Sequence, residues 1–288
     1  MHIVMTGGTS GFGQEAARRM AAAGHSLTIG ARGRGADNAT TRFVRLDLED
    51  LASIDAFAEA VRRGAPVDAL VLNAGLQLAA PERMANGIEK TFFVNHLAHV
   101  RLLHRLLGDL APGTRVVLTG SGTHDPAEKT PVTPPDHADA RRLAYPDTDP
   151  TLPRAPRKQA FRAYSSSKLA CIMIARHLAR LRPDLSVMAF DPGYVPWTGL
   201  GRANHPIIAA LVSIILPRTM ARDRSSTVPL SGGFLADLAT APVYAEERGT
   251  YWSVRKPNLV AIEPSTLARD DAAAAKLWED SLALLGLA

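Results

Sequence analysis

The 288-residue sequence predicts an α/β protein built around a parallel sheet. Short apolar runs at 2–5, 26–29 and 69–72 alternate with alanine- and charge-rich helical segments at 15–23 and 51–63. This alternation is the pattern of βαβ units, in which neighbouring strands run parallel. A single core over residues 1–288 is expected, because 46% hydrophobic and 21% charged residues are close to the average of globular proteins.

The remaining elements continue the same order. A short strand is expected at 42–45, and strands follow at 115–118 and 186–190. From 88 to 110, apolar residues recur every three or four positions, which predicts one long helix with a buried face. A second helical pattern covers 163–181 and ends at a proline.

The segment from 125 to 160 interrupts this regular pattern. It holds eight prolines and shows neither the helical nor the strand period. We therefore expect it to be an irregular insertion within one domain.

Composition also excludes several classes of protein. The net charge of +5 is spread over the chain without a basic run, so no nucleic-acid partner is expected. The longest apolar run, 207–216, is about half of the ~20 residues that a membrane-spanning helix needs. The single cysteine, Cys171, cannot form an internal disulfide, and no secretion signal precedes the first strand. A cytoplasmic protein is the expectation.

A glycine-rich turn joins the first strand to the first helix. Gly7, Gly8, Gly11 and Gly13 follow Thr6 there. Glycines let the backbone turn tightly, so that free amides and the positive end of a helix can face a pyrophosphate. The spacing departs from the G-x-G-x-x-G pattern, and a turn without a ligand remains open as the alternative.

Tyr164 and Lys168 lie four residues apart on a predicted helix and therefore share one face. A phenol is too weak an acid for efficient proton transfer at neutral pH, and a neighbouring ammonium lowers its pKa. The pair is thus a candidate general acid with its tuning lysine. Taken alone, the pair is more typical of a solvated helix surface than of a catalytic site.

Further motifs occur in a fixed order along the chain. They are Thr6, Gly7, Gly11, Gly13, Asp47, Leu48, Asn73, Ala74, Gly75, Asn95, Ser121, Tyr164, Lys168, Pro192 and Gly193. Together they resemble the short-chain dehydrogenase/reductase family. The resemblance implies a doubly wound Rossmann fold with a mostly parallel seven-stranded sheet, helices on both faces, and NAD(P) across the carboxyl ends of the strands.

The resemblance also implies catalytic roles. Tyr164 would protonate the forming alkoxide, and Lys168 would bind the nicotinamide ribose and lower the pKa of Tyr164. Ser121 would hydrogen-bond the substrate oxygen, although 43 residues separate it from Tyr164, far more than in many members. Asn95 would hold a water that links Lys168 to solvent; a solvent-facing polar residue is the alternative.

The cofactor contacts carried over from the family come from five places in the chain. They are Thr6, Gly7, Thr9, Ser10, Gly11, Phe12 and Gly13, then Arg32, then Asp47 and Leu48, then Asn73, Ala74 and Gly75, and finally Tyr164, Lys168, Pro192, Gly193, Val195 and Thr198. Arg32 stands in the region where NAD-preferring members carry an acid after the second strand. Since a guanidinium accepts the 2′-phosphate, NADPH is the expected cofactor, and no metal is assigned.

Parts of the chain are most similar to the branch of retinol dehydrogenases and protochlorophyllide oxidoreductases. An NADPH-dependent reductase of a carbonyl on a bulky lipophilic molecule is therefore expected, with a substrate cap at about 200–220. Reduction of a conjugated C=C bond and a non-catalytic NADPH-binding sensor or scaffold remain alternatives. Many family members form homodimers or homotetramers through helices corresponding to 88–110 and 161–181. The insertion at 125–160 can block this assembly. His124 and His205 are expected at the polar surface.

Overall fold

The computed structural model describes residues 1–33, 35, 37–196 and 222–287. Its centre is an eight-stranded sheet in the order β3-β2-β1-β4-β5-β6-β7-β8. The strands are β1 (His2–Thr6), β2 (Ser26–Ala31), β3 (Thr41–Arg45), β4 (Ala69–Leu72), β5 (Arg115–Thr119), β6 (Ser186–Asp191), β7 (Arg248–Arg255) and β8 (Asn258–Ala261). All neighbouring pairs are parallel except β7 and β8. The chain builds outward from β1 to β3 and then restarts at β4, so the strand order reverses between β1 and β4.

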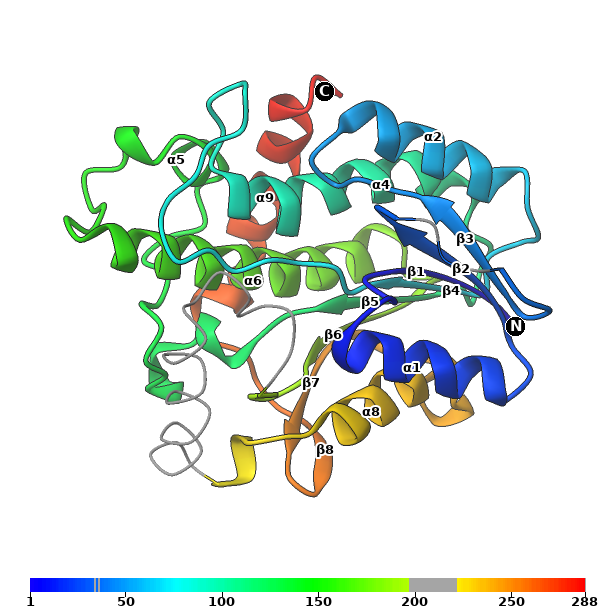
Figure 1. Ribbon diagram of the computed structural model, residues 1–288. Helices are drawn as coiled ribbons and strands as arrows, with labels where there is room; N and C mark the ends of the chain where they lie inside the picture. The colour runs from blue at the N-terminus through cyan, green and yellow to red at the C-terminus, as the bar shows by residue number, and fades with distance from the viewer. Residues whose placement is uncertain (34, 36, 197–221, 288) are drawn as a thin grey trace.

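Helices cover both faces of the sheet (Figure 1). Two helices, α1 (Gly11–Ala22) and α8 (Val228–Thr240), pack together on one face. The other face carries α2 (Leu51–Arg62), α4 (Ala98–Leu106) and α6 (Pro156–Leu181), with α9 (Asp271–Leu284) against α6. The expected α/β Rossmann fold is confirmed. Within the described ranges, no helix is both long and apolar enough to cross a membrane.

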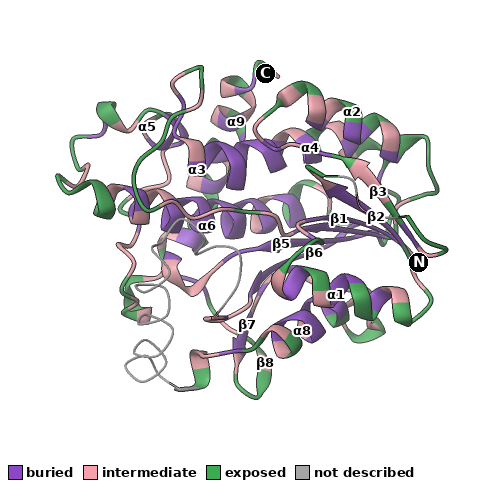
Figure 2. Cartoon of the chain, viewed as in Figure 1, coloured by how far each residue is buried: buried purple, intermediate pink, exposed green. Residues whose placement is uncertain are grey.

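The apolar side chains form two clusters, one on each face of the sheet. Figure 2 shows the central strands buried along their length and the helices buried where they face the sheet. Strands buried on both faces read as continuous apolar runs, which is why β4, β5 and β6 could be recognised in the sequence.

The sheet has one strand more than the seven expected. The additional strand, β8, pairs antiparallel with the end of β7. Its four residues are exposed or half-buried at the sheet edge. An edge strand of this kind needs no apolar run, so no apolar pattern marks it in the sequence.

The helix expected over 88–110 is divided into segments of different winding. It begins as α3 (Lys90–Phe92), passes through a π-helical turn over Phe93–Leu97, continues as α4 and ends in a 3-10 turn over Leu107–Asp109. All five residues of the π-helical turn are buried. The buried face was predicted correctly, but the change of winding was not.

The insertion contains one short helix, α5 (Ala140–Ala144), and several turns. α6 begins at Pro156, before the predicted start at 163, because proline fits the first turn of a helix. Ser165, next to Tyr164 on α6, donates a hydrogen bond of 2.6 Å to the carbonyl of Thr133. The insertion is therefore fastened to the helix that carries the tyrosine.

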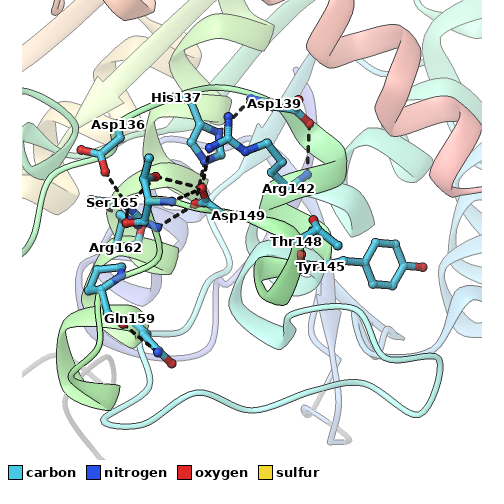
Figure 3. Close-up of polar contacts among 12 residues, drawn as sticks. Asp136, His137, Asp139, Arg142, Tyr145, Thr148, Asp149, Gln159, Arg162 and Ser165 are labelled. Carbon is cyan, nitrogen blue, oxygen red and sulfur yellow. Dashed lines mark hydrogen bonds and ion pairs between the residues drawn. The ribbon is translucent and has the colours of Figure 1, made fainter.

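A buried carboxylate, Asp149, organises the insertion (Figure 3). Its oxygens accept hydrogen bonds from Arg142 at 2.5 Å, Arg162 at 2.7 Å and His137 at 3.0 Å. Arg162 belongs to α6 and also pairs with Asp136. Burial raises the pKa of Asp149, but these donors outweigh it and hold that pKa well below the usual range, so the carboxylate stays charged.

Candidate active site

The glycine-rich turn lies at the carboxyl end of β1, beside the reversal of strand order. Gly7 and Gly11 have φ of +70° and +57°, which L side chains rarely adopt. A Cβ on Gly13 would lie 2.1 Å from the carbonyl oxygen of Gly7, so only glycine allows this approach.

The start of α1 is open to a phosphate. Its N-cap, Ser10, makes no side-chain cap, and no acidic residue lies in the first turn. The first amides of α1 therefore have no capping side chain, and they carry the partial positive charge of the helix end. The turn fits the pyrophosphate of a dinucleotide. Thr9 and Ser10 are exposed, whereas the Phe12 side chain packs in the core against Phe190, leaving only its backbone for a cofactor.

Asn73 supports this turn from the end of β4. Its Nδ2 donates to the Gly7 carbonyl at 2.9 Å, and its Oδ1 accepts from the Thr119 hydroxyl at 3.0 Å. Both polar ends of the side chain therefore hold the turn and β5 together. Thr6 accepts hydrogen bonds of 3.0 Å from the backbone N–H groups of both Asn73 and Ala74.

His99, which sequence reasoning did not select, connects Thr6 to Asn95. Its Nδ1 lies 3.0 Å from the Asn95 carbonyl oxygen, and its Nε2 lies 3.1 Å from the Thr6 hydroxyl. Burial lowers the pKa of His99 to about 4, so the ring is neutral at pH 7. Since a carbonyl only accepts, Nδ1 carries the proton and Nε2 accepts from Thr6. A signal did exist in the sequence: His99 lies one turn after Asn95.

Asn95 lies within the π-helical turn and is 1% exposed, so the solvent-facing alternative is wrong. Its Oδ1 accepts from the Leu76 backbone N–H at 2.8 Å, and its Nδ2 donates to the Leu76 carbonyl at 2.9 Å and to Ser167 at 3.0 Å. The side chain thus fixes the loop after β4 against α6. Gly75 fits between Asn95 and Lys168, because its Cβ would lie 3.1 Å from Asn95 Oδ1 and 3.5 Å from Lys168 Nζ.

Tyr164 and Lys168 face the same site from α6 and are 8% and 4% exposed. The Lys168 ammonium donates to the Thr119 carbonyl at 2.9 Å and lies 5.8 Å from the centre of the Tyr164 ring. The Ser121 hydroxyl lies beside the Tyr164 phenol, close enough to lower the pKa of that phenol. The structure therefore brings Ser121 and Tyr164 together although they are 43 positions apart in the sequence, because the intervening insertion packs aside against α6.

Burial has the largest effect on the pKa of both groups. It raises the pKa of Tyr164 well above its ordinary value, while the nearby Ser121 hydroxyl acts in the opposite direction. It lowers the pKa of Lys168. The resemblance predicts that Lys168 lowers the pKa of Tyr164, whereas desolvation of the phenol raises that pKa in this structure.

The segment after β6 closes the other side of the site. Gly193 has φ of +69° and donates its N–H to Asp191 at 3.0 Å, while the Pro192 carbonyl accepts from Ser231 at 2.7 Å. Val195 is buried. Thr198 and the expected cap at about 200–220 lie outside the described residues.

His124 is buried rather than at the surface, which corrects the sequence-based expectation. Its Nδ1 donates to the Ser121 carbonyl at 2.7 Å, and its Nε2 accepts from the Ser265 N–H at 3.1 Å. Two polar partners satisfy the ring, so it can lie inside the protein without exposure to water. His205 lies outside the described residues.

The residues expected near the adenosine of the cofactor lie at the ends of β2 and β3. Arg32 is exposed directly after β2. Asp47 is half-buried and accepts a hydrogen bond from the Glu49 N–H at 3.1 Å, whereas the Leu48 side chain belongs to the core. These positions lie at the same sheet edge as the glycine turn, as a dinucleotide across that edge requires.

Together, the phosphate-binding turn, the open parallel sheet and the Ser121–Tyr164–Lys168 group define an NAD(P)-dependent oxidoreductase. A sequence model described as short chain dehydrogenase matches residues 1–126. A "putative daunorubicin C-13 ketoreductase" of Streptomyces sp. (strain C5) is 30% identical over 297 residues, which is 99% of this chain and 92% of that protein. The chain belongs to the short-chain dehydrogenase/reductase family.

Two further comparisons agree with this family assignment. Protochlorophyllide reductase A of Hordeum vulgare is 29% identical over 321 residues, covering 99% of this chain and 80% of that protein, which places the chain near the protochlorophyllide reductase branch. The solved structure of a short chain dehydrogenase from Burkholderia cenocepacia in complex with NADP has a TM-score of 0.64 at 22% identity, covering 88% of this chain and 95% of the other. Among the curated relatives, the chain spans between 63% and 100% of their length.

Proposed function

We propose that the protein is an NADPH-dependent reductase that reduces a carbonyl group on a bulky, lipophilic small molecule. The observation that carries the proposal is the buried group of Tyr164, Ser121 and Lys168 at the carboxyl edge of the sheet, next to the glycine turn. This group offers proton donors to a substrate oxygen beside the place where the family holds its nicotinamide.

When bound, the cofactor supplies a hydride to the substrate carbon. Ser121 and Tyr164 then act on the oxygen that becomes an alkoxide. The Ser121 oxygen already accepts hydrogen bonds from the Thr123 N–H at 3.3 Å and from the Thr123 hydroxyl at 3.2 Å. Its own proton is therefore directed away from Thr123, toward the phenol and the substrate oxygen. Tyr164 donates its proton to the alkoxide.

Lys168 stabilises the tyrosinate that this step leaves behind. One of its three N–H groups is held by the Thr119 carbonyl, which fixes the ammonium and leaves two donors for the hydroxyls of a nicotinamide ribose. The site is buried, so an ammonium close to the phenol has a larger effect than it would have in water. Reprotonation of Tyr164 follows through Lys168, which packs against the loop that Asn95 holds.

The preference for NADPH is supported by charge. An exposed guanidinium, Arg32, follows β2, where an acidic side chain would repel a 2′-phosphate. The carbonyl substrate is supported by the name of the Streptomyces relative, a putative daunorubicin C-13 ketoreductase, and its lipophilic character by the apolar sequence at 207–216. The similarity to protochlorophyllide reductase favours reduction of a conjugated C=C bond as the second candidate.

The test uses NADPH deuterated at the 4-pro-S position with a panel of bulky conjugated ketones. Deuterium on the carbinol carbon supports carbonyl reduction. Deuterium on the β-carbon establishes the C=C candidate instead, with Ser121 and Tyr164 polarising the conjugated carbonyl. The Tyr164→Phe variant should bind NADPH and lose turnover; turnover that survives in this variant would remove the phenol from the mechanism.

A further inference from the structure

A cavity of about 570 Å³ lies beside the ends of β2 and β3. Its lining residues are Arg32, Gly33, Gly35, Asp37, Phe43 and Arg45. Parallel pairing of the two strands aligns Ala31 with Arg45. Arg32 and Arg45 therefore leave the sheet at the same edge, next to each other. The cavity is far larger than a phosphate group and can admit the sugar that carries it.

Arg45 faces the side of the sheet that holds the glycine turn. Side chains alternate along a strand, so Phe43 and Arg45 point to one face and Val44 to the other. Phe43 packs against the cluster that contains α1, whereas Val44 packs against the opposite cluster. The guanidinium of Arg45 thus lies on the α1 side, where a dinucleotide would place its adenosine ribose.

The loop after β2 is held close to β3. A Cβ on Gly35 would lie 2.3 Å from a ring carbon of Phe43, so glycine allows the backbone to rest on the ring. Asp37 accepts a hydrogen bond of 2.7 Å from the Phe43 backbone N–H. These contacts place Arg32 and Arg45 around one space; Arg34 lies outside the described residues.

Among the described residues, no carboxylate forms an ion pair with Arg32 or Arg45. Within the described part of the chain, neither forms an ion pair or a side-chain hydrogen bond, and both are exposed. Asp37 is the one acid among the described lining residues, and one of its oxygens is used by the backbone of Phe43. A cavity with two unpaired guanidinium groups and one engaged carboxylate favours an anion.

We propose that Arg45 is a second determinant of cofactor specificity, which binds the 2′-phosphate of the adenosine ribose together with Arg32. The inference rests on the proposed NADPH preference. A phosphomonoester has three terminal oxygens and a charge near −2, so two guanidinium groups from adjacent strands can each donate to it. Arg45 comes from β3, in the sequence just before Asp47, and not from the loop after β2 that the motif comparison selected.

The experiment measures the dissociation constants of NADP⁺, NAD⁺ and 2′,5′-ADP by titration calorimetry. Arg45→Ala should raise the dissociation constants of NADP⁺ and 2′,5′-ADP about 10- to 100-fold, the range for a hydrogen bond between charged groups. The dissociation constant of NAD⁺ should stay within about twofold. Arg42→Ala is the matched control: Arg42 is exposed on the same strand but does not line the cavity. It should change none of the three constants.

The outcomes separate this inference from the one on which it rests. If Arg32→Ala weakens NADP⁺ while Arg45→Ala behaves like Arg42→Ala, the role of Arg45 is refuted and the NADPH preference stands. If the unchanged protein binds NAD⁺ as tightly as NADP⁺, the preference itself fails, and the inference with it. If Arg32→Ala and Arg45→Ala both weaken NADP⁺ binding and leave NAD⁺ binding unchanged, the NADPH preference and the role of Arg45 are both supported.

Discussion

Replacing His99 with leucine tests the buried link between the glycine turn and Asn95. Leucine fills a similar volume with an apolar side chain and lacks both ring nitrogens. The Thr6 hydroxyl loses its acceptor at 3.1 Å, and the Asn95 carbonyl loses a donor at 3.0 Å. Leaving buried polar groups without partners costs about 1–3 kcal/mol of the free energy of unfolding. Because Thr6 also orients the loop after β4, we expect cofactor affinity to fall about 2- to 10-fold.

The substitution also changes how stability depends on pH. The pKa of His99 is lowered from 6.5 to about 4 in the folded protein. Between these values the unfolded chain binds a proton that the folded chain does not, so stability decreases as pH falls from about 6.5 to about 4. The shift corresponds to about 3 kcal/mol over that window. In His99→Leu, this contribution to the pH dependence should be absent.

Urea unfolding at pH 7 and pH 5, with cofactor titration at pH 7, measures both effects. The matched control is His96→Leu, because His96 is equally buried on the same helix but its Nε2 lies 2.8 Å from Ser281, away from the glycine turn. Burial also lowers the pKa of His96, to about 3, so the control should flatten the pH dependence as well and leave cofactor affinity unchanged. Unaltered cofactor affinity and an unaltered pH slope in His99→Leu would refute the reasoning.

Three other substitutions probe the scaffold. Asp149→Asn should lower the free energy of unfolding, measured in urea, by about 3 kcal/mol, because it leaves buried guanidinium groups without their carboxylate. A decrease below about 1 kcal/mol would mean that the cluster is hydrated. Asp55→Asn should lower the free energy of unfolding by about 1–2 kcal/mol at pH 7 and by much less at pH 2. Two arginines lower the pKa of this partly exposed carboxyl to about 2, so the stability it contributes is lost as pH falls from about 4 through about 2. Gly13→Ala should abolish cofactor binding and lower the free energy of unfolding by at least about 1–3 kcal/mol. Gly108→Ala is the control and should change neither quantity, because its added Cβ meets no atom within 4 Å. Cofactor binding retained by Gly13→Ala would show that the turn can shift to admit a Cβ.

Much of the fold was predictable because its signals are local. Strands buried on both faces read as apolar runs, and the glycine turn needs glycines for steric reasons that the sequence displays directly. Tyr164 and Lys168 share one helix face, but it was their place in the ordered set of family motifs that selected them. These features depend on residues that are neighbours in the chain.

The features that sequence reasoning missed depend on contacts between distant segments. His99 and His124 read as ordinary polar residues, and only the folded chain supplies their partners, the Thr6 hydroxyl and the Ser265 backbone. Asn73 was assigned to the cofactor, yet both ends of its side chain hold Gly7 and Thr119. Arg45 gave no motif signal, because it is brought next to Arg32 only by the pairing of β2 with β3.

The π-helical turn at 93–97 sets a rule for which insertions and deletions the helix can accept. A π turn takes one residue more than an α turn to make the same circuit of the helix axis. Removing one residue there would therefore restore regular α winding without rotating the rest of the helix, so the buried face of α4 would still meet the sheet. A residue added or removed within α4 itself meets no such turn and would rotate everything beyond it by about 100°. Homologous chains should therefore differ in length by one residue at 93–97 more readily than within α4.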